Sequence, residues 1–554
     1  MKEKLKYILP LLFVFATAIV AEAKIAPNTS IQQLQLQKTV FVSGEKVWLK
    51  NSLVSGHYNG HQNILFVDLC GEGSVITSRI LLRENNHWQG ELTIPDSLET
   101  GVYLLRAYTG NYNGKPEITS KLISVINRFG NNNTNETRKL NRNYLAIDQS
   151  VMVPENEGKL LKTYADQSKF SPKSKVKFWV EKEGNDYPSG ISYSVYKIPD
   201  SLGNSTTQNL DDAENRVVYA RSDDEKIYNS LIISGKVISK SDSLPVEGEM
   251  VLFSVPDSIP QIIYSKTDSK GEFHIHIDEC YGSKDAIIQT VSKDRELQIT
   301  IYPNLLNPPV QIPFYISEAT EQSEFVKLAV QRAVLQKVYS FEDKIDSAKK
   351  TFKYPFYGKA SNVVIPDQYF DLDNFEEISK EILPFSRIRK DKEGYSMRIF
   401  NPDKTGFFDN PWILVDGIPV YNIQDLNVLN SRKIKRIETQ PELRCYGDLY
   451  IESALSIFTY KCQFDEVKMP QNSIRTFVET FSNTSEYVGN KFIESSVMAD
   501  FRDVLFWEPV LEPFTNATQV EVQCSYERGS YVAVVQAIDS EGKTQRSIFE
   551  FTVE

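Results

Sequence analysis

Short runs of alternating apolar and polar residues recur along most of the chain, and clusters of Gly, Asn and Asp separate them. Residues 47–49, 64–69 and 102–108 are examples near the start. A period of two is typical of a strand with one buried face, and the clusters supply residues that favour turns. Tyr and Phe, which suit half-buried strands, number 28 and 30. We therefore predict a mostly β protein made of tandem sandwiches.

The chain has 554 residues, which is more than one ordinary domain holds. Hydrophobic residues make up 41% and charged residues 24%, so each domain can bury a core and disorder of the whole chain is excluded. The net charge is −11. Because nucleic acid requires a basic protein surface, we expect no nucleic-acid partner.

The first 23 residues have the pattern of a secretory signal peptide. Lys2, Lys4 and Lys6 precede an apolar run over residues 7–20, and Ala-Glu-Ala follows at residues 21–23. No cysteine stands at the expected cleavage point, so we predict no lipid anchor. Residues 24–554 contain no other apolar run long enough to span a membrane. We expect an exported protein that is soluble or peripherally attached to a membrane.

Cysteines are too few to form a disulfide framework. The chain has 5, an odd number, so at least one thiol is unpaired. Cys445 and Cys462 are candidates for a pair if their strands are adjacent, and the sequence leaves that open. Hydrophobic cores are therefore expected to hold the domains together.

Residues 24–127 and 128–230 are predicted to form two successive β-sandwiches, with a polar linker over residues 127–142. The segments 42–48 (VSGEKVW), 92–95 (LTIP) and 101–108 (GVYLLRAY) resemble the second macroglobulin domain of alpha-macroglobulins. In that family a Gly-Glu turn opens a strand and a Gly-x-Tyr strand closes the sandwich. The resemblance implies a macroglobulin-like, immunoglobulin-like fold for the first domain and, more loosely, for the second.

Residues 231–303 are predicted to form a third sandwich. The segments 234–237 (SGKV), 244–248 (LPVEG) and 267–273 (TDSKGEF) resemble the carboxypeptidase regulatory-like domain, a small transthyretin-like sandwich without peptidase chemistry. After it, the apolar period changes to about four over residues 318–339, where Val326, Val330 and Val334 recur. With Phe325, Leu328, Leu335 and Val338 they predict an amphipathic helix packed on the chain's own β-domains. A connector completes this segment, residues 317–362.

Residues 363–465 resemble the plug domain of TonB-dependent outer-membrane receptors. The matching segments are 411–420 (PWILVDGIPV), 434–438 (IKRIE), 445–448 (CYGD) and 454–461 (ALSIFTYK). They imply a small α+β domain. A plug sits inside a transmembrane barrel, but only 92 residues follow Cys462. Because such a barrel needs many strands of about ten residues each, the chain is not itself a transporter.

Residues 466–554 are predicted to form a last macroglobulin-like sandwich, on the segments 502–509 (RDVLFWEP) and 529–534 (GSYVAV). The whole order of domains resembles an envelope protein family of Gram-negative bacteria in which the plug-like module occurs without a barrel. The resemblance implies a place in the periplasm, at the outer membrane or on the cell surface.

Candidate chemistry has simpler explanations. Residues 70–73 (CGEG) are similar to the thioester of alpha-macroglobulins, but Gly73 replaces the required Gln, so a hairpin is expected. His274 and His276 share one strand face without a third metal ligand nearby. Asp371 to Asn374 is expected to cap a helix from residue 375. No nucleophile elbow, zinc-protease or phosphate-binding motif is present. We therefore assign no catalytic, cofactor-binding or metal-binding residue and no small-molecule substrate.

The sequence thus favours a non-catalytic, exported binding or scaffold protein, accessory to an outer-membrane (TonB-dependent) transport or assembly complex. Its expected partner is an envelope or outer-membrane protein. The alternative is a macroglobulin-like protease-binding protein without a thioester, with residues 201–228 or 340–362 as the cleaved segment. The plug-like module is the candidate contact, through its Asp-Gly turn and the strands predicted over residues 434–438 and 454–461. The sequence leaves open whether the module binds a partner or is only a structural spacer. The candidate interaction residues are Asp416, Gly417, Ile434, Glu438, Tyr446 and Gly447.

Overall fold

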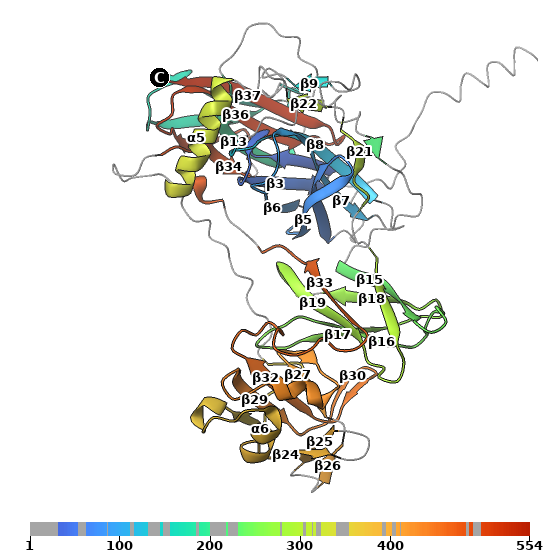
Figure 1. Cartoon of the computed structure of the whole chain (residues 1–554). Helices are drawn as coiled ribbons and strands as arrows, with labels where there is room; N and C mark the ends of the chain where they lie inside the picture. The colour runs from blue at the N-terminus through green and yellow to red at the C-terminus, as the bar shows by residue number, and fades with distance from the viewer. Residues whose placement is uncertain are drawn as a thin grey trace, which may run out of the picture. The chain divides into compact units, whose positions relative to one another are not determined.

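The structure, a computed structural model, describes most of the chain beyond the first 31 residues (Figure 1). The described residues are 32–53, 63–85, 87–110, 116–130, 145–147, 156–183, 188–199, 218–219, 231–277, 280–302, 306–312, 314–316, 323–339, 354–390, 395–401, 406–409, 411–483, 487–490, 500–512 and 514–554. Most of them are in strands, which confirms the predicted fold class. The predicted signal peptide lies outside them. Within these ranges no helix is long and apolar enough to cross a membrane.

Two compact units make up the fold. Unit 1 contains residues 1–229, 306–345 and 484–554, and unit 2 contains residues 230–305 and 346–483. Each unit is described by itself below.

The first sandwich of unit 1 has one sheet of three strands and one of five. The three-stranded sheet has the order β1 (Gln32–Leu36), β3 (Lys46–Leu53), β6 (His87–Thr93). The five-stranded sheet has the order β2 (Val40–Val42), β8 (Pro116–Ile126), β7 (Gly101–Gly110), β4 (Ile64–Gly71), β5 (Ser74–Leu82). Trp88 of one sheet and Leu105 of the other lie in a single buried core. The predicted sandwich is therefore present, and Glu72 and Gly73 form the two-residue turn between β4 and β5.

The second sandwich of unit 1 joins two segments that the sequence pattern predicts to be separate domains. One sheet has the order β10 (Leu161–Ala165), β12 (Lys175–Lys182), β35 (Ala517–Gln523). The other has the order β11 (Lys169–Phe170), β37 (Thr544–Val553), β36 (Gly529–Ile538), β13 (Ser189–Lys197), β34 (Val504–Glu508). The separate sandwiches predicted for residues 128–230 and 466–554 are thus wrong. Phe178 and Tyr531 pack in one core because strands from both segments alternate in both sheets.

The helix predicted in unit 1 is α5 (Glu324–Tyr339). Its buried face differs from the predicted stripe. Val326 is buried, but Leu328, Val334 and Leu335 are exposed. Arg332 is buried, and Ala329 and Ala333 pack against Val42. The remaining elements described in unit 1 are the pairs β9 (Leu145–Ile147) with β22 (Phe314–Ile316) and β14 (Val218–Tyr219) with β21 (Pro309–Gln311), and the 3-10 turn η4 (Val488–Asn490).

Unit 2 begins with the predicted third sandwich. One sheet has the order β18 (Glu272–Ile277), β15 (Leu231–Ser239), β20 (Leu297–Ile301). The other has the order β17 (Ile262–Lys266), β16 (Met250–Ser254), β19 (Ser283–Thr290), β33 (Ser473–Glu479). Strand β33 pairs with β19 from Ser283↔Glu479 to Gln289↔Ser473. Residues 473–479 therefore belong to this sandwich and not to the predicted C-terminal one.

The residues predicted to resemble a plug domain form a small α+β domain in unit 2, which we call the plug-like module. Its main sheet has the order β23 (Asn362–Val364), β29 (Ile434–Gln440), β32 (Ala454–Thr459), β27 (Trp412–Val415), β28 (Ile418–Pro419). A second sheet has the order β24 (Ser386–Lys390), β25 (Tyr395–Asn401), β26 (Gly406–Phe408). The remaining elements are α6 (Phe375–Glu381), η2 (Pro366–Gln368), η3 (Ile423–Val428) and the hairpin of β30 (Arg444–Tyr446) and β31 (Leu449–Ile451).

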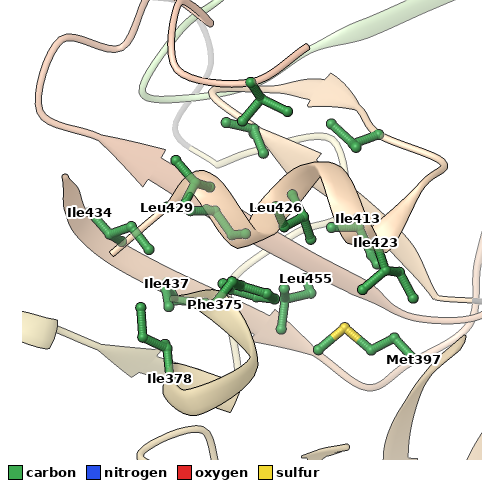
Figure 2. Close-up of a cluster of buried hydrophobic side chains, with 14 of the residues drawn as sticks. Phe375, Ile378, Met397, Ile413, Ile423, Leu426, Leu429, Ile434, Ile437 and Leu455 are labelled. Carbon is green, nitrogen blue, oxygen red and sulfur yellow. The ribbon is translucent and has the colours of Figure 1, made fainter. Parts of the chain in front are cut away.

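One buried core holds the plug-like module together. Figure 2 shows Phe375 and Ile378 of α6 facing Ile437 of β29, with Leu426 of η3 nearby. Asn374 caps α6 by accepting a hydrogen bond from the Glu377 N–H, as the sequence predicts. Ile287 of β19 also lies in this core. The module therefore packs directly on the third sandwich, and the two form one unit.

Candidate interaction site

The turn at Asp416 and Gly417 is a tight hairpin, and the Asp416 side chain points inward. Leu414↔Pro419 and Val415↔Ile418 pair across it, so the loop has two residues. Both have positive φ, 50° and 90°, which suits an Asp-Gly hairpin turn. The Asp416 carboxylate is fully buried and accepts hydrogen bonds from Thr459 N and Oγ1, both at 2.7 Å, and from Phe464 N at 3.1 Å. The carboxylate therefore fixes the loop after β32.

Gly417 faces the third sandwich. A Cβ added at this glycine would lie 2.9 Å from Pro260 Cβ, so the contact requires glycine. The Asp257 N–H donates to the Asp416 carbonyl oxygen at 3.1 Å. The turn predicted to face a partner thus contacts residues of its own unit.

The strand residues of the prediction are also engaged within unit 2. Ile434 is fully buried in the module core. Glu438 accepts hydrogen bonds from Tyr357 Oη and Arg436 Nε, both at 2.7 Å. Burial, together with the Glu438 carboxylate, raises the pKa of Tyr357. These contacts hold residues 354–362, the end of the predicted connector, against the module.

Tyr446 and Gly447 occupy the turn between β30 and β31, again next to the third sandwich. The Tyr264 hydroxyl donates to the Tyr446 carbonyl at 2.6 Å, and the Tyr446 hydroxyl donates to the Phe356 carbonyl. A Cβ at Gly447 would lie 2.5 Å from Tyr264 Oη. The Tyr446 ring is still 40% exposed. Of the predicted residues we have placed, Asp416 and Ile434 are buried, and only Tyr446 offers a large exposed side chain.

A more exposed surface of the same module, which we call the edge surface, is not among the residues predicted from the sequence. Its residues are Val363, Ile365, Tyr369, Phe370 and Tyr460, and their side chains are 39% to 64% exposed. Strand β23 lies at the edge of the main sheet, where β29 is its neighbour on one side. A short apolar run at residues 363–365, followed by proline and an aromatic pair, is the signal that identifies this edge.

Contacts along β29 and the residues around it bring the edge-surface residues together. Val363 pairs with Glu438 across β23 and β29. The Tyr460 hydroxyl donates to the Asp367 carboxylate. Asp371 forms an ion pair with Arg432. Residues 362–372 therefore run beside residues 431–439, and Tyr460, which follows β32, reaches this outer segment through its contact with Asp367.

The candidate chemical groups of the sequence lie apart from this surface. Burial raises the pKa of the Cys70 thiol to about 12. His274 and His276 are exposed on β18, and the His274 ring lies 2.8 Å from Ser234 Oγ. Cys445 and Cys462 are free thiols. Over the described ranges, no group of three or more His, Cys, Asp or Glu side chains is arranged to hold a metal ion.

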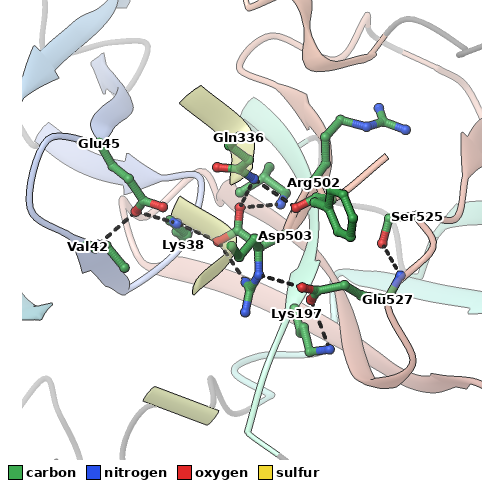
Figure 3. Close-up of polar contacts among 12 residues, drawn as sticks. Lys38, Val42, Glu45, Lys197, Gln336, Arg502, Asp503, Ser525 and Glu527 are labelled. Atoms are coloured by element: carbon green, nitrogen blue, oxygen red, sulfur yellow. Dashed lines mark hydrogen bonds and ion pairs between the residues drawn. The ribbon is translucent and has the colours of Figure 1, made fainter. Parts of the chain in front are cut away.

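A cluster of buried charges lies in unit 1 (Figure 3). Lys38 contacts Glu45 at 2.7 Å and Asp503 at 2.6 Å. Arg332 of α5 contacts Asp503 at 3.4 Å and Glu527 at 3.1 Å. Burial disfavours the charged forms of Lys38 and Asp503. The carboxylates of Asp503 and Glu45 nevertheless raise the pKa of Lys38. In turn, Lys38 and Arg332 hold the pKa of Asp503 below its ordinary value. These paired charges join α5 to both sandwiches, which gives the cluster a structural role.

Comparisons with known proteins identify no family. No family model matches the chain, and no curated protein matches it. Among solved structures, the native Escherichia coli alpha-2-macroglobulin has 10% identity and a TM-score of 0.16, covering 96% of this chain and 23% of that chain. Salmonella alpha-2-macroglobulin reacted with methylamine has 10% identity and a TM-score of 0.15, covering 96% and 24%. A tetra-tandem repeat of a large adhesion protein has 8% identity and a TM-score of 0.16, covering 95% and 100%. The chain thus spans about a quarter of the two macroglobulin chains.

Proposed function

We propose that this chain is a non-catalytic, exported protein of the cell envelope that binds another protein, as an accessory to an outer-membrane transport or assembly complex. The observation that carries the proposal is the edge surface. Four large apolar side chains lie exposed on the edge strand β23 and the segment that follows it, and the exposed Tyr460 contacts this segment through Asp367. Soluble proteins usually cover such edges or protect them with charge.

An extended segment of a partner fits this edge chemically. A partner strand placed beside β23 would pair with backbone groups, which give affinity, and would bury Val363, Ile365 or Phe370, which give specificity. The envelope location rests on the lysines and apolar run within residues 1–23 and on the resemblance to a barrel-less plug module.

The test compares the wild-type protein with variants of the edge surface. Each tagged full-length protein is purified from detergent-solubilised envelopes, and bound proteins are identified by mass spectrometry. We expect wild type to retain a specific outer-membrane protein and the double variant Val363→Lys, Phe370→Ser to lose it. Leu244→Ser is the matched control, because Leu244 is also exposed, at 61%, in the third sandwich. Recovery of no outer-membrane protein by wild type would sink the proposal.

Protease binding is the competing function. Of its two candidate cleavage segments, residues 201–228 lie outside the described ranges except for 218–219, and residues 340–353 lie outside them entirely. Incubation with several endoproteases separates the two functions. Cleavage at one of these segments with retention of the protease favours the competing function, whereas release of the protease favours the edge-surface proposal.

A further inference from the structure

The second sheet of the plug-like module, β24, β25 and β26, has two chemically different faces. Ile388, Met397 and Ile399 lie on the inner face and pack on the module core. The register Arg387↔Arg398 and Phe400↔Phe407 places those four side chains on the outer face, and the strand period adds Arg389. We call the set Arg387, Arg389, Arg398, Phe400 and Phe407 the arginine–phenylalanine face. These strands belong to a different sheet from β23 of the edge surface.

Like charges face each other on this sheet. Arg387 of β24 is directly opposite Arg398 of β25, and Arg389 follows two residues along the same strand. Directly opposed like charges destabilise an antiparallel pair. Among the described residues Arg398 has one carboxylate partner, Asp409 at 2.6 Å, and no ion pair engages Arg387 or Arg389, which are exposed. A local arrangement that costs stability is typical of a binding surface.

Two phenylalanines extend the same face. The Phe400 and Phe407 rings pack edge to face with their centroids 5.2 Å apart, and Phe407 is 44% exposed. Arginine and aromatic side chains are the residues most enriched where proteins bind proteins. The face therefore offers two open guanidinium groups beside an apolar platform.

We propose that the arginine–phenylalanine face binds an acidic segment of a partner protein, with carboxylates on Arg387 and Arg389 and an apolar side chain on the phenylalanine pair. A guanidinium group binds a carboxylate through two parallel hydrogen bonds. On the same face, Asp409 already contacts Arg398 through a single ion pair at 2.6 Å. The net charge of −11 disfavours a large anionic surface such as a membrane or nucleic acid, because the rest of the chain repels it. A short acidic segment meets only the local positive charge.

The test uses the purified full-length protein and a labelled synthetic peptide in which Glu alternates with Phe and Ser. Fluorescence anisotropy measures its affinity. We expect the double variant Arg387→Thr, Arg389→Thr to bind the peptide at least about tenfold more weakly. Lys175→Thr, Lys177→Thr is the matched control, because these lysines are exposed at the same spacing on β12 of unit 1. A peptide with Gln in place of Glu is expected to bind weakly to every variant.

The remaining outcomes decide against the proposal. Equal affinity of wild type and the arginine variant, or equal affinity for the Gln peptide, overturns it. Binding to phosphatidylglycerol vesicles in place of the peptide overturns it in favour of a lipid surface. Folding of the arginine variant is checked by its Tm, which should not fall because a repulsive pair is removed. The inference adds a second surface to the proposed binding function, and the envelope purification tests the edge surface separately.

Discussion

Replacing Asp416 with alanine tests whether this residue shapes the plug-like module or contacts a partner. The carboxylate is buried and accepts three hydrogen bonds, two from Thr459 and one from Phe464. In Asp416→Ala the two backbone N–H groups and the hydroxyl lose their acceptor. The loop that follows β32 also contains Cys462 and Phe464 at positive φ, 52° and 55°, which few non-glycine residues adopt without support.

The expected cost follows from those contacts. A hydrogen bond to a charged acceptor contributes about 1.5–3 kcal/mol. The summed contribution of three such hydrogen bonds is larger than the loss of stability expected in the variant. Water can reach part of the opened site, and the variant no longer has to bury a carboxylate, which itself costs free energy. We therefore expect a loss of about 3–4 kcal/mol in the stability of the module, which corresponds to a factor of roughly 10²–10³ in opening.

Hydrogen exchange read by mass spectrometry measures this loss on the full-length protein. We expect peptides covering residues 454–467 to exchange about 10²–10³ times faster in Asp416→Ala. Peptides of unit 1 should keep their rates. Asp373→Ala is the control, because Asp373 is exposed at the start of α6. Unchanged exchange in Asp416→Ala would refute the structural role and would return this residue to the set of partner contacts.

Three further predictions concern single contacts. Burial lowers the pKa of Lys50 from 10.5 to about 7. Between these two pH values the unfolded chain holds a proton that the folded chain does not, so the free energy of unfolding rises as the pH increases. Denaturant titrations at pH 7 and pH 9 should show this rise in wild type but not in Lys50→Met. Asp503→Ala leaves Lys38 and Arg332 buried without that partner, and faster hydrogen exchange of α5 should report a loss of about 3–5 kcal/mol. The control Glu541→Ala breaks an exposed ion pair with Lys543 and should leave the exchange of α5 unchanged. Gly417→Ala should lower the Tm more than Gly248→Ala, because both have positive φ but only Gly417 has a neighbour, Pro260, where the added Cβ would lie.

Local strand structure followed from the sequence, but strand partners did not. Val176, Phe178 and Val180 are buried and Lys177 is exposed, as their alternation predicts. The same pattern carries no information on which strand lies beside β12. Its neighbour β35 is more than 300 residues further along the chain. The pairing of β12 with β35 depends on how their side chains fit together in three dimensions. The predicted domain boundaries were wrong for this reason.

The helix and the candidate site show a second limit. Periodicity placed α5 correctly but chose the valine stripe as its buried face, whereas Arg332 is drawn inward by Asp503 and Glu527. The Asp-Gly motif correctly predicted a hairpin turn at residues 416–417. It could not show that the carboxylate points to Thr459, because that contact joins segments 43 residues apart. Exposure of the edge surface likewise depends on which strand ends the sheet.

Because the second sandwich takes strands from two distant segments, it can fold only late in synthesis. Strand β13 has no complete sheet until β34 and β36 exist, about 300 residues later. During synthesis from the N-terminus, residues 161–197 must therefore wait, with their apolar faces uncovered, while all of unit 2 is produced. A chain that stops after residue 483 would lack the partners of a sandwich begun before residue 200, so its N-terminal half would be a target for chaperones and proteases. A fragment study of this protein therefore needs both ends of the chain.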